Sequence, residues 1–342
     1  MKRKKFKKIL IVGAGWYGCH IGLYLKKKKH NVKIYEKGSD IFQGSSGKNQ
    51  FRLHQGYHYP RSLTTIQEAK INYQKFKKKY INFIKFPKKN IYCIANKLSL
   101  IDFGTYVNIL KANKLPFTQR KFTFLKNIEG AVLVKEGVFQ NSKIIKYFKK
   151  KLKKEIFFKK KIENINKLSE NFDYVIDCTN NTQKNNFKKK IKYILTISFI
   201  YKKKSKKSEY TLTVMDGKLP SIFPYADKKN YYTLTHSKYT HLKSFNSIDK
   251  LENYKKIISK LLVKKYKKLS EKSICDFYTN FSEKFSYKGY FLSYKVIPYG
   301  KSDCRPVFYN KYKNIISVFS PKIANIFSAE SIVNNFINEQ KH

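Results

Sequence analysis

Residues 8–36 read KILIVGAGWYGCHIGLYLKKKKHNVKIYE, and this stretch decides the fold. The apolar run at residues 9–12 is typical of a short buried strand, and residues 16–28 have the pattern of a helix. A second apolar run, residues 32–35, ends just before Glu36. The turn after the first run is a GxGxxG motif formed by Gly13, Gly15 and Gly18. Strand, glycine turn, helix and strand in this order predict a βαβ unit.

Each glycine of the motif has a physical task in a βαβ unit that binds a dinucleotide. The first permits a tight turn, the second lets a pyrophosphate approach the backbone, and the third lets helix and strand pack closely. The pyrophosphate would lie at the helix N-terminus, where N–H groups and the helix dipole favour negative charge. Glu36 can accept hydrogen bonds from an adenosine ribose and would repel a 2′-phosphate. The motif therefore predicts FAD or NAD rather than NADP, and the alternative is a glycine turn that binds nothing.

The composition is that of a globular chain with a strongly basic surface. The 342 residues are 42% hydrophobic, enough for two domains or for one domain with an inserted lobe. The formal net charge is +52, yet only five of the 74 basic residues are arginines. Nucleic-acid binders usually need arginine for bidentate contacts with phosphates and guanines. We interpret the lysines as a solvated surface, with polyanion binding as the alternative.

Neither a metal site nor a disulfide framework nor a membrane span is indicated. The five cysteines form no CxxC pair, which favours a reducing compartment such as the cytoplasm. The basic N-terminus and the apolar run after it are similar to a signal peptide, but the glycine motif interrupts that run. No stretch reaches the roughly 18 apolar residues of a membrane-spanning helix.

Residues 37–62, after the second predicted strand, read KGSDIFQGSSGKNQFRLHQGYHYPRS. A long irregular stretch of this kind is more typical of a binding loop than of a spacer. Together with the βαβ motif, the part SSGKNQFRLHQGYHYPRS resembles the FAD-dependent oxidoreductases of the D-amino-acid oxidase type. The resemblance implies that this loop lies along the flavin, with Arg52, Leu53 and His54 beside the isoalloxazine ring.

The resemblance implies two further contacts with FAD. The run FDYVIDCTNN, residues 172–181, resembles the strand that closes on the dinucleotide, with Thr179 at the contact and Asn180 where the family has glycine. Asparagine tolerates positive φ, so this turn is expected to survive. After a strand at residues 314–319, Ser320 would cap the last helix, whose N-terminus points at the flavin in the family. The expected cofactor-binding residues are Gly13, Ala14, Gly15, Tyr17, Gly18, Glu36, Lys37, Ser45, Ser46, Asn49, Gln50, Thr179, Pro321 and Lys322.

Residues 191–239 change to alternating aromatic and β-branched runs with no intervening helix, which predicts an antiparallel sheet. In the family such a sheet is the substrate lobe. The fold class is therefore α/β: a Rossmann-like FAD-binding domain with a central parallel sheet, interleaved with an antiparallel-sheet substrate domain. The FAD-binding domain is expected at residues 1–89, 130–185 and 297–342, and the substrate domain at residues 90–129 and 186–296.

Apolar periodicity and capping residues predict the remaining elements. Helices are expected at residues 62–84, 98–111 and 247–266 and from Asn141 onward, strands at residues 90–95, 117–125 and 287–296, and a turn at Gly137.

The resemblance implies a substrate site without a strong nucleophile, because the cofactor supplies the difficult step. Arg305 lies in DCRPV, where an Arg-Pro pair in related amine and amino-acid oxidases grips a substrate carboxylate. His54 in the loop and His236 on the substrate sheet are candidates for a base or a hydrogen-bond donor on opposite sides of one cleft. For each of these residues a structural role is the alternative.

The sequence therefore predicts an FAD-dependent oxidoreductase that oxidises a small amine, amino acid or hydroxylated substrate by hydride transfer to the flavin. The expected partner is a small molecule rather than a specific nucleic acid. Two alternatives are a NAD-linked oxidoreductase and a polyanion-binding protein with a vestigial dinucleotide fold, and a bound flavin would exclude both.

Overall fold

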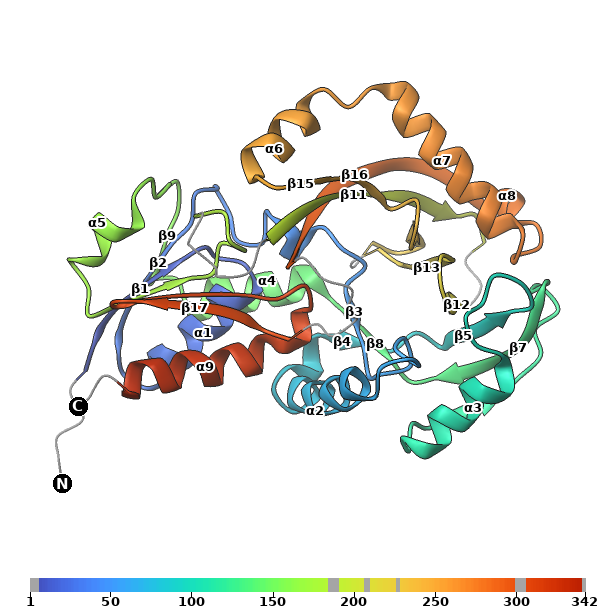
Figure 1. The fold of residues 1–342 in the computed structure, drawn as a ribbon, viewed down its shortest axis with the longest axis horizontal. Coiled ribbons are helices and arrows are strands. Elements are labelled where there is room, and N and C mark those ends of the chain that lie inside the picture. Colours follow the sequence, from blue (N-terminus) through green and yellow to red (C-terminus); the bar gives the residue numbers. More distant parts are fainter. Residues whose placement is uncertain (1–5, 184–190, 206–209, 226–227, 299–305, 340–342) are drawn as a thin grey trace. The chain divides into compact units, whose positions relative to one another are not determined.

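The computed structural model describes residues 6–183, 191–205, 210–225, 228–298 and 306–339 (Figure 1). The chain forms two compact units, each built from separate stretches of sequence. The first unit contains residues 1–48, 143–192 and 295–342, and the second contains residues 49–142 and 193–294. The two units are therefore interleaved along the sequence.

The first unit is built on a six-stranded sheet. Its strands are β1 (Lys8–Val12), β2 (Asn31–Tyr35), β9 (Ile156–Phe157), β10 (Tyr174–Asp177), β17 (Phe308–Tyr312) and β18 (Ile315–Phe319). Their spatial order is β17-β18-β10-β1-β2-β9, and only the edge strand β17 runs antiparallel to its neighbour. Its helices are α1 (Trp16–Lys27), α4 (Asn141–Lys151), α5 (Ile165–Ser169) and α9 (Ile326–Glu339), with 3₁₀ turns η1 (Ser45–Gly47) and η3 (Ile323–Asn325). The first two residues of α4 belong to the second unit.

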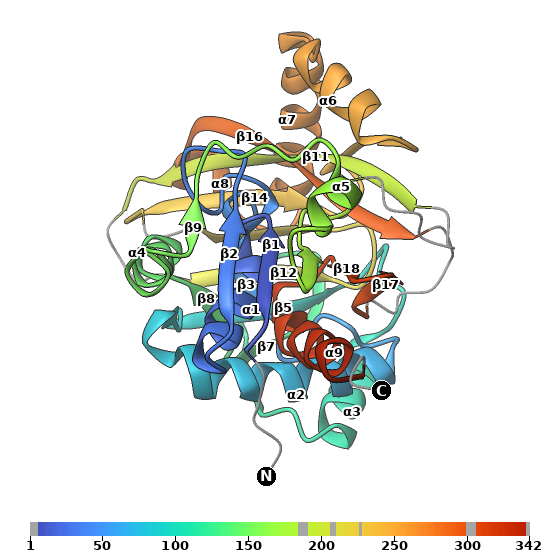
Figure 2. The ribbon, with the colours of Figure 1, turned by 90° about the vertical axis from the view of Figure 1, so that its left-hand side faces the viewer.

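Apolar side chains of this sheet point alternately to its two faces, and helices cover both faces. Ile11 points to the face of α1, where its side chain would touch a Cβ placed at Gly22. Helix α9 packs beside α1 (Figure 2). Leu10 and Val12 point to the opposite face and pack with Ile165 of α5. Parallel sheets are typically buried on both faces in this way.

The second unit contains a nine-stranded sheet and a three-stranded sheet. The strands are β3 (Arg52–Leu53), β4 (Ile84–Lys85), β5 (Lys89–Ala95), β6 (Phe117–Gln119), β7 (Ile128–Val134), β8 (Gly137–Phe139), β11 (Ile191–Lys203), β12 (Tyr210–Met215), β13 (Pro220–Pro224), β14 (Tyr231–His236), β15 (His241–Phe245) and β16 (Phe285–Pro298). Residues 191–192 of β11 and 295–298 of β16 belong to the first unit. The large sheet has the order β15-β11-β14-β13-β12-β5-β7-β6, with β16 also paired to β11, and the small sheet has the order β3-β8-β4. Its helices are α2 (Leu63–Tyr80), α3 (Phe103–Ala112), α6 (Ile248–Lys256), α7 (Lys260–Cys275) and α8 (Phe281–Lys284), and a 3₁₀ turn η2 (Ile81–Phe83) follows α2.

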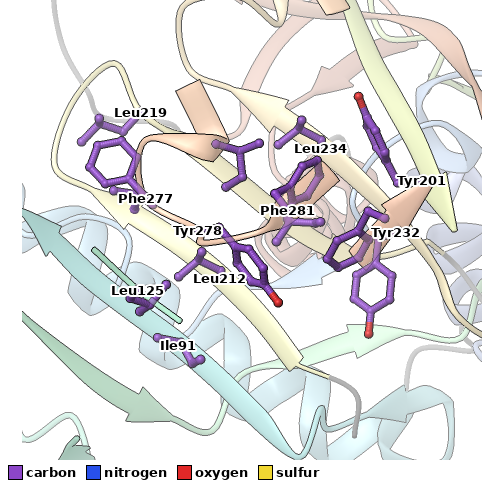
Figure 3. Packing of buried hydrophobic residues seen from close by; sticks show 14 of the residues in the cluster. Ile91, Leu125, Tyr201, Leu212, Leu219, Tyr232, Leu234, Phe277, Tyr278 and Phe281 are labelled. Carbon is purple, nitrogen blue, oxygen red and sulfur yellow. The ribbon is translucent and has the colours of Figure 1, made fainter. Parts of the chain in front are cut away.

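The period-two alternation of the strands builds one core on each face of the large sheet. On one face Ile91 of β5 and Leu212 of β12 pack with Val263 of α7, in the aromatic-rich cluster that Figure 3 shows. On the other face Tyr92 of β5 packs with side chains of α2 and α3, which include Ile66, Tyr106 and Leu110. The antiparallel sheet expected at residues 191–239 is present in β11 to β14. A parallel pair, β5 with β12, joins this sheet to β7 and β6.

Two predicted helices have different bounds in the structure, because local N-caps set where a helix begins. The helix expected at residues 98–111 begins only at Phe103, since the side chain of Asp102 accepts the N–H of Thr105 and caps it there. The helix expected at residues 247–266 is two helices, α6 and α7. Ser259 accepts the N–H of Leu262 and starts the second helix afresh.

Three other boundaries also differ from the prediction. The strand expected at residues 117–125 ends at Gln119. Gly137 is not a turn but the first residue of β8, which pairs with both β3 and β4. Ser320 does not cap the last α-helix, because the turn η3 intervenes and α9 begins at Ile326. The N-cap at Ser62 is confirmed, and α2 ends at Tyr80 before η2.

The compact units divide the chain differently from the predicted domains. Residues 49–89 and 130–142 pack within the second unit, whereas the sequence assigned them to the FAD-binding domain. That assignment concerns what the residues bind, so it stays a prediction. No helix within the described ranges is both long and apolar enough to cross a bilayer.

Candidate functional site

The glycine turn between β1 and α1 has the shape that the motif predicts. Gly13 adopts a φ of +98°, which side chains rarely adopt, and its N–H donates to the carbonyl of Tyr35 at 2.8 Å. A Cβ at Gly18 would lie 1.8 Å from the carbonyl oxygen of Gly13. Only glycine at this position lets the N-terminus of α1 lie so close to the end of β1.

Glu36, which follows β2, is held by two backbone N–H groups. Its Oε2 accepts from Ala14 at 2.8 Å, and its Oε1 accepts from Gly38 at 2.9 Å. A carboxylate oxygen can accept more than one hydrogen bond, so the side chain retains capacity for the hydroxyls of a ribose. This carboxylate is therefore fixed beside the glycine turn, as the sequence predicts for a dinucleotide site.

The serine-rich loop reaches the N-terminus of α1. The Oγ of Ser46 accepts the N–H of Trp16, the first residue of α1, at 3.0 Å. A Cβ at Gly15 would lie 2.8 Å from that same oxygen, so the backbone approaches closely here only because residue 15 is glycine. The helix N-terminus favours negative charge at this place. The turn, Glu36 and this serine together fit the diphosphate and ribose of a dinucleotide. Ser45 opens η1, and Lys37 is exposed.

The end of β10 lies against the same turn. A Cβ at Gly13 would lie 3.1 Å from the carbonyl oxygen of Cys178. The N–H of Thr179 donates to Oδ1 of Asp177 at 2.8 Å. Asn180 has a φ of 60°, so the expected positive φ at this position is confirmed. Thr179 thus lies beside the glycine turn, and its contact with a cofactor stays a prediction.

Tyr17 links α1 to the segment before η3. Its hydroxyl donates to the carbonyl of Lys322 at 2.6 Å. Burial raises the pKa of Tyr17, so the hydroxyl stays protonated at neutral pH and keeps this bond. The structure therefore brings Tyr17 and Lys322 together within the first unit. The contacts of Pro321 and Lys322 with a cofactor stay predictions.

In the second unit, one face of the large sheet carries a row of hydroxyl groups, here called the hydroxyl face. It consists of Thr211 and Thr213 on β12, Ser221 on β13, and Thr233 and Thr235 on β14. Thr213 stands opposite Ser221, and Ser221 stands opposite Thr235, so these side chains share one face. All except Thr235 are buried. The leucines and isoleucine between them point to the opposite core.

Arg52 of β3 lies over the hydroxyl face. Its Nη2 donates to the hydroxyl of Tyr92 at 2.7 Å and to Oγ1 of Thr213 at 3.1 Å. Its guanidinium carbon lies 3.9 Å from the ring centroid of Phe223. The side chain is only 7% exposed. Lysine cannot combine forked donation and planar stacking in this way, which explains an arginine in a chain where lysine is the default.

Glu136, between β7 and β8, is buried beside Arg52 and His54. Its Oε1 accepts the N–H of Gln55 at 2.6 Å, and its Oε2 accepts the hydroxyl of Tyr92. The Nη2 of Arg52 and the Nδ1 of His54 lie 4.0 and 3.9 Å from Oε2. Burial raises the pKa of the Glu136 carboxyl, and Arg52 opposes that shift. A carboxyl group perturbed in this way is a candidate for a functional site.

The other predicted residues of the loop also contact this unit. Gln50 Nε2 donates to the carbonyl of Thr233 at 3.3 Å, and Gln50 Oε1 accepts from Ser221 Oγ at 3.4 Å. The Oδ1 of Asn49 accepts the N–H of Phe51. Gln50 is therefore held on the hydroxyl face, and its contact with a flavin stays a prediction.

The structure does not bring His236 and His54 together in any described contact. His236 ends β14, and its Nδ1 accepts the N–H groups of Lys238 and Tyr239 at 3.1 and 3.3 Å. Its Nε2 lies 3.1 Å from Oγ of Ser273. Burial lowers the pKa of His236 to about 4, so its ring is neutral near pH 7. The ring thus stabilises the turn after β14, and a catalytic role for it stays a prediction.

Arg305 lies outside the described residues. Among the residues that the structure does describe, no group of three histidine, cysteine, aspartate or glutamate side chains could hold a metal ion.

The hydroxyl face and Glu136 were not predicted from the sequence. The face had a signal, because YTLTVM at residues 210–215 and YYTLTH at residues 231–236 place threonine and leucine on opposite sides of a strand. Glu136 had no comparable signal, since its partners come from β3 and β5, far away in the sequence.

The sequence is similar to known flavoproteins along most of its length. Residues 8–269 match the model of the DAO family, described as FAD dependent oxidoreductase. The chain is 28% identical over 339 residues to the FAD-dependent monooxygenase FPY4 of Fusarium mangiferae, covering 96% of this chain and 91% of that protein. It is 26% identical over 367 residues to the FAD-dependent monooxygenase kojA of Aspergillus flavus, covering 96% and 85%.

Solved structures show the same fold. Glycine oxidase from Geobacillus kaustophilus has a TM-score of 0.71 at 12% identity, with 98% of this chain and 95% of that chain covered. L-alpha-glycerophosphate oxidase from Mycoplasma pneumoniae, solved with FAD bound, has the same TM-score, identity and coverage. The α/β fold with a Rossmann-like unit and an antiparallel substrate sheet is confirmed.

The family match decides the cofactor and the enzyme class. It covers well over half of the chain, and it sets aside both the NAD-linked enzyme and the vestigial polyanion-binding fold. The protein is thus an enzyme whose cofactor is FAD, and it belongs to the DAO family of FAD-dependent oxidoreductases.

Proposed function

We propose that this enzyme oxidises a small amine, amino acid or hydroxylated substrate by hydride transfer to FAD. In the first unit, Gly15 and Ser46 would hold the diphosphate of FAD, and Glu36 would hold its ribose. When bound, FAD supplies an acceptor for the hydrogen and two electrons of a substrate C–H bond. The single observation that carries the substrate class is the hydroxyl face of the second unit with Arg52 over it.

The hydroxyl face and Arg52 suit a small polar substrate. Tyr92 and Thr213 already hold the guanidinium in place, so its charge need not reorganise when a substrate binds. Hydroxyl groups both donate and accept, and they can therefore orient an amine, a carboxylate or an alcohol. An apolar substrate could not use the donors and acceptors of these groups.

The reaction also needs an acceptor for the proton of the substrate amine or alcohol. We assign this role to His54, whose side chain is 22% exposed and lies beside Glu136. With bound FAD as the acceptor for the hydrogen and two electrons of the C–H bond, His54 would take the N–H or O–H proton, and the substrate would become an imine or a carbonyl compound. The negative charge of an ionised Glu136 would stabilise the protonated imidazole.

The test is an anaerobic screen of the purified holoenzyme. Amino acids, amines and hydroxy acids are mixed with it without any nicotinamide, and the visible flavin band is followed. We expect at least one of these substrates to bleach the band. His54→Gln should slow bleaching by about 10²-fold or more, as expected for loss of a general base.

The matched control is His241→Gln, which alters an exposed histidine of β15 in the same unit. It should bleach at the wild-type rate. Equal slowing by both variants, or none by His54→Gln, would contradict the role of His54. A band that no substrate bleaches would contradict the proposed reaction.

A second candidate is monooxygenation, which the printed names of the two fungal relatives favour. In that case the flavin band should stay oxidised with substrate alone and bleach with NADH or NADPH. One oxygen atom of labelled O₂ should then enter the product, which direct substrate oxidation does not predict.

A further inference from the structure

The joint between α6 and α7 exposes two large aliphatic side chains. Ile257, just after α6, is 75% exposed, and Leu261, in the first turn of α7, is 79% exposed. Figure 1 shows this joint where α6 and α7 meet, away from the strands of the large sheet. Helix α6 contacts β15, and α7 contacts β13 and β14. Exposed aliphatic side chains at the end of a helical pair are not needed for the fold of the second unit.

Helix α7 separates an inner apolar face from an outer cationic face. Val263, Ser270 and Ile274 are buried, and Val263 and Ile274 belong to the core against the sheet. The outer face has the spacing i, i+3, i+4, i+7 and i+11, and it consists of Leu261, Lys264, Lys265, Lys268 and Lys272. All five of these side chains are exposed.

The charge of this outer face is not neutralised locally. Within the described part of the chain, none of its four lysines forms a salt bridge, whereas Lys267 on the flank pairs with Glu271 at 2.7 Å. Lys256 and Lys260 add two more exposed cations next to the aliphatic pair. The joint and the outer face of α7 are here called the α6–α7 tip, which comprises Lys256, Ile257, Lys260, Leu261, Lys264, Lys265, Lys268 and Lys272.

We propose that the α6–α7 tip binds the surface of an anionic lipid bilayer. Aliphatic side chains at the end of an amphipathic helix can enter the headgroup region, while lysines beside them attract anionic lipids. The same charge could attract a nucleic acid, but that partner would gain nothing from Ile257 and Leu261. The tip also lacks the arginine and aromatic side chains that suit phosphodiester and base contacts.

Exposed lysines on a helix of this chain are not always accompanied by exposed apolar side chains, as α4 shows. That helix also carries exposed lysines, among them Lys146 and Lys150, yet none of its large apolar side chains is exposed. Conversely, Leu98 and Leu100 are 78% and 62% exposed but are not part of a lysine-bearing helix face. The lysines of α4 are therefore a matched control for charge alone, and Leu98 and Leu100 are a matched control for apolar exposure alone.

The test is co-sedimentation of the holoenzyme with vesicles of phosphatidylcholine mixed with phosphatidylglycerol, compared with phosphatidylcholine alone. We expect binding to the anionic vesicles only, and weaker binding as salt rises. Ile257→Ser with Leu261→Ser should weaken binding by about tenfold or more. Lys264→Gln with Lys268→Gln should weaken it by about fivefold for each lysine.

Two control pairs should bind like the wild type: Leu98→Ser with Leu100→Ser, and Lys146→Gln with Lys150→Gln on α4. All variants change exposed residues, and the flavin spectrum checks that each remains folded. The proposal is overturned if the wild type ignores anionic vesicles, if the tip variants bind as well as the wild type, or if the controls lose as much. If the tip binds no vesicle, but binds an oligonucleotide equally well with and without Ile257 and Leu261, it is a surface for nucleic acid instead.

Discussion

At the scale of single residues, the protein uses rare residue types where their chemistry is needed. Arg52 is one of five arginines in the chain, and it combines stacking on Phe223 with donation to Tyr92 and Thr213. Glu36 is one of 22 acidic residues in a chain of net charge +52, and two backbone N–H groups hold it. A lysine at position 36 could not accept these two N–H groups, and a lysine at position 52 could not both stack on Phe223 and donate in a fork.

Replacing Glu36 by Gln should weaken FAD binding. An amide accepts more weakly than a carboxylate, and it can make at most one of the two backbone bonds through its oxygen. Charged hydrogen bonds contribute roughly 1.5–3 kcal/mol, so we expect the Kd of FAD to rise by about tenfold or more. Fluorescence titration of the apoprotein with FAD measures this.

The control for that substitution is Glu163→Gln, which removes the same charge from an exposed ion pair with Lys161. It should leave the Kd of FAD unchanged. If Glu36→Gln binds FAD as tightly as the wild type, Glu36 does not hold the cofactor.

His236 should make the stability of the protein fall in acid. Its pKa is lowered from 6.5 to about 4 in the folded state, because burial disfavours the charged ring. The unfolded chain therefore takes up a proton first, and stability is lost as pH falls from about 6.5 through about 4. His236→Asn, whose side-chain oxygen can replace Nδ1 as the acceptor, should lose less stability over this window in urea unfolding. Parallel pH profiles of the two proteins would contradict this account.

At the scale of elements, the βαβ unit depends on how closely α1 approaches β1. Gly18→Ala would place a Cβ against the carbonyl of Gly13, and backbone at this place cannot move aside without opening the turn. We expect this variant to lose FAD or to fail to accumulate as folded protein. Gly44→Ala is the control, because no atom lies within 4 Å of its added Cβ. Flavin content per chain measures both, and a fully loaded Gly18→Ala protein would contradict the close approach.

Local elements could be predicted from the sequence, whereas pairing between distant segments could not. The strands β1 and β2 and helix α1 carry their own periodicity and turn chemistry, and their predicted bounds are close to those observed. The prediction of one continuous helix at residues 247–266 was wrong, because the N-cap at Ser259 starts a second helix there despite a continuous apolar pattern. The parallel pairing of β5 with β12 depends on contacts about 120 residues apart, which no local pattern encodes.

The candidate site shows the same division. Gly13, Gly18 and Glu36 were predicted because a local motif sets their geometry. Glu136 and Tyr92 were missed because they become neighbours only when β3, β5 and the segment between β7 and β8 come together. Arg305 was predicted from the resemblance alone, and it stays a prediction.

At the scale of the whole molecule, the groups that we propose for the cofactor and for the substrate lie in different units. The first contains the glycine turn and Glu36, and the second contains the hydroxyl face, Arg52 and His54. The lysines that produce the net charge of +52 are not the groups that form the candidate cofactor and substrate sites. Those sites are built from backbone groups, hydroxyls and a few charged side chains. The charge can still hasten the arrival of an anionic substrate, an effect that should weaken as salt rises.

The most direct measurement is an anaerobic titration of the purified protein with a substrate that bleaches it, with no nicotinamide present. One bound FAD per chain should be fully reduced by one equivalent of substrate, which is converted to its imine or carbonyl product. A protein that neither contains nor takes up FAD would contradict the account. So would a flavin band that only NADH or NADPH can bleach.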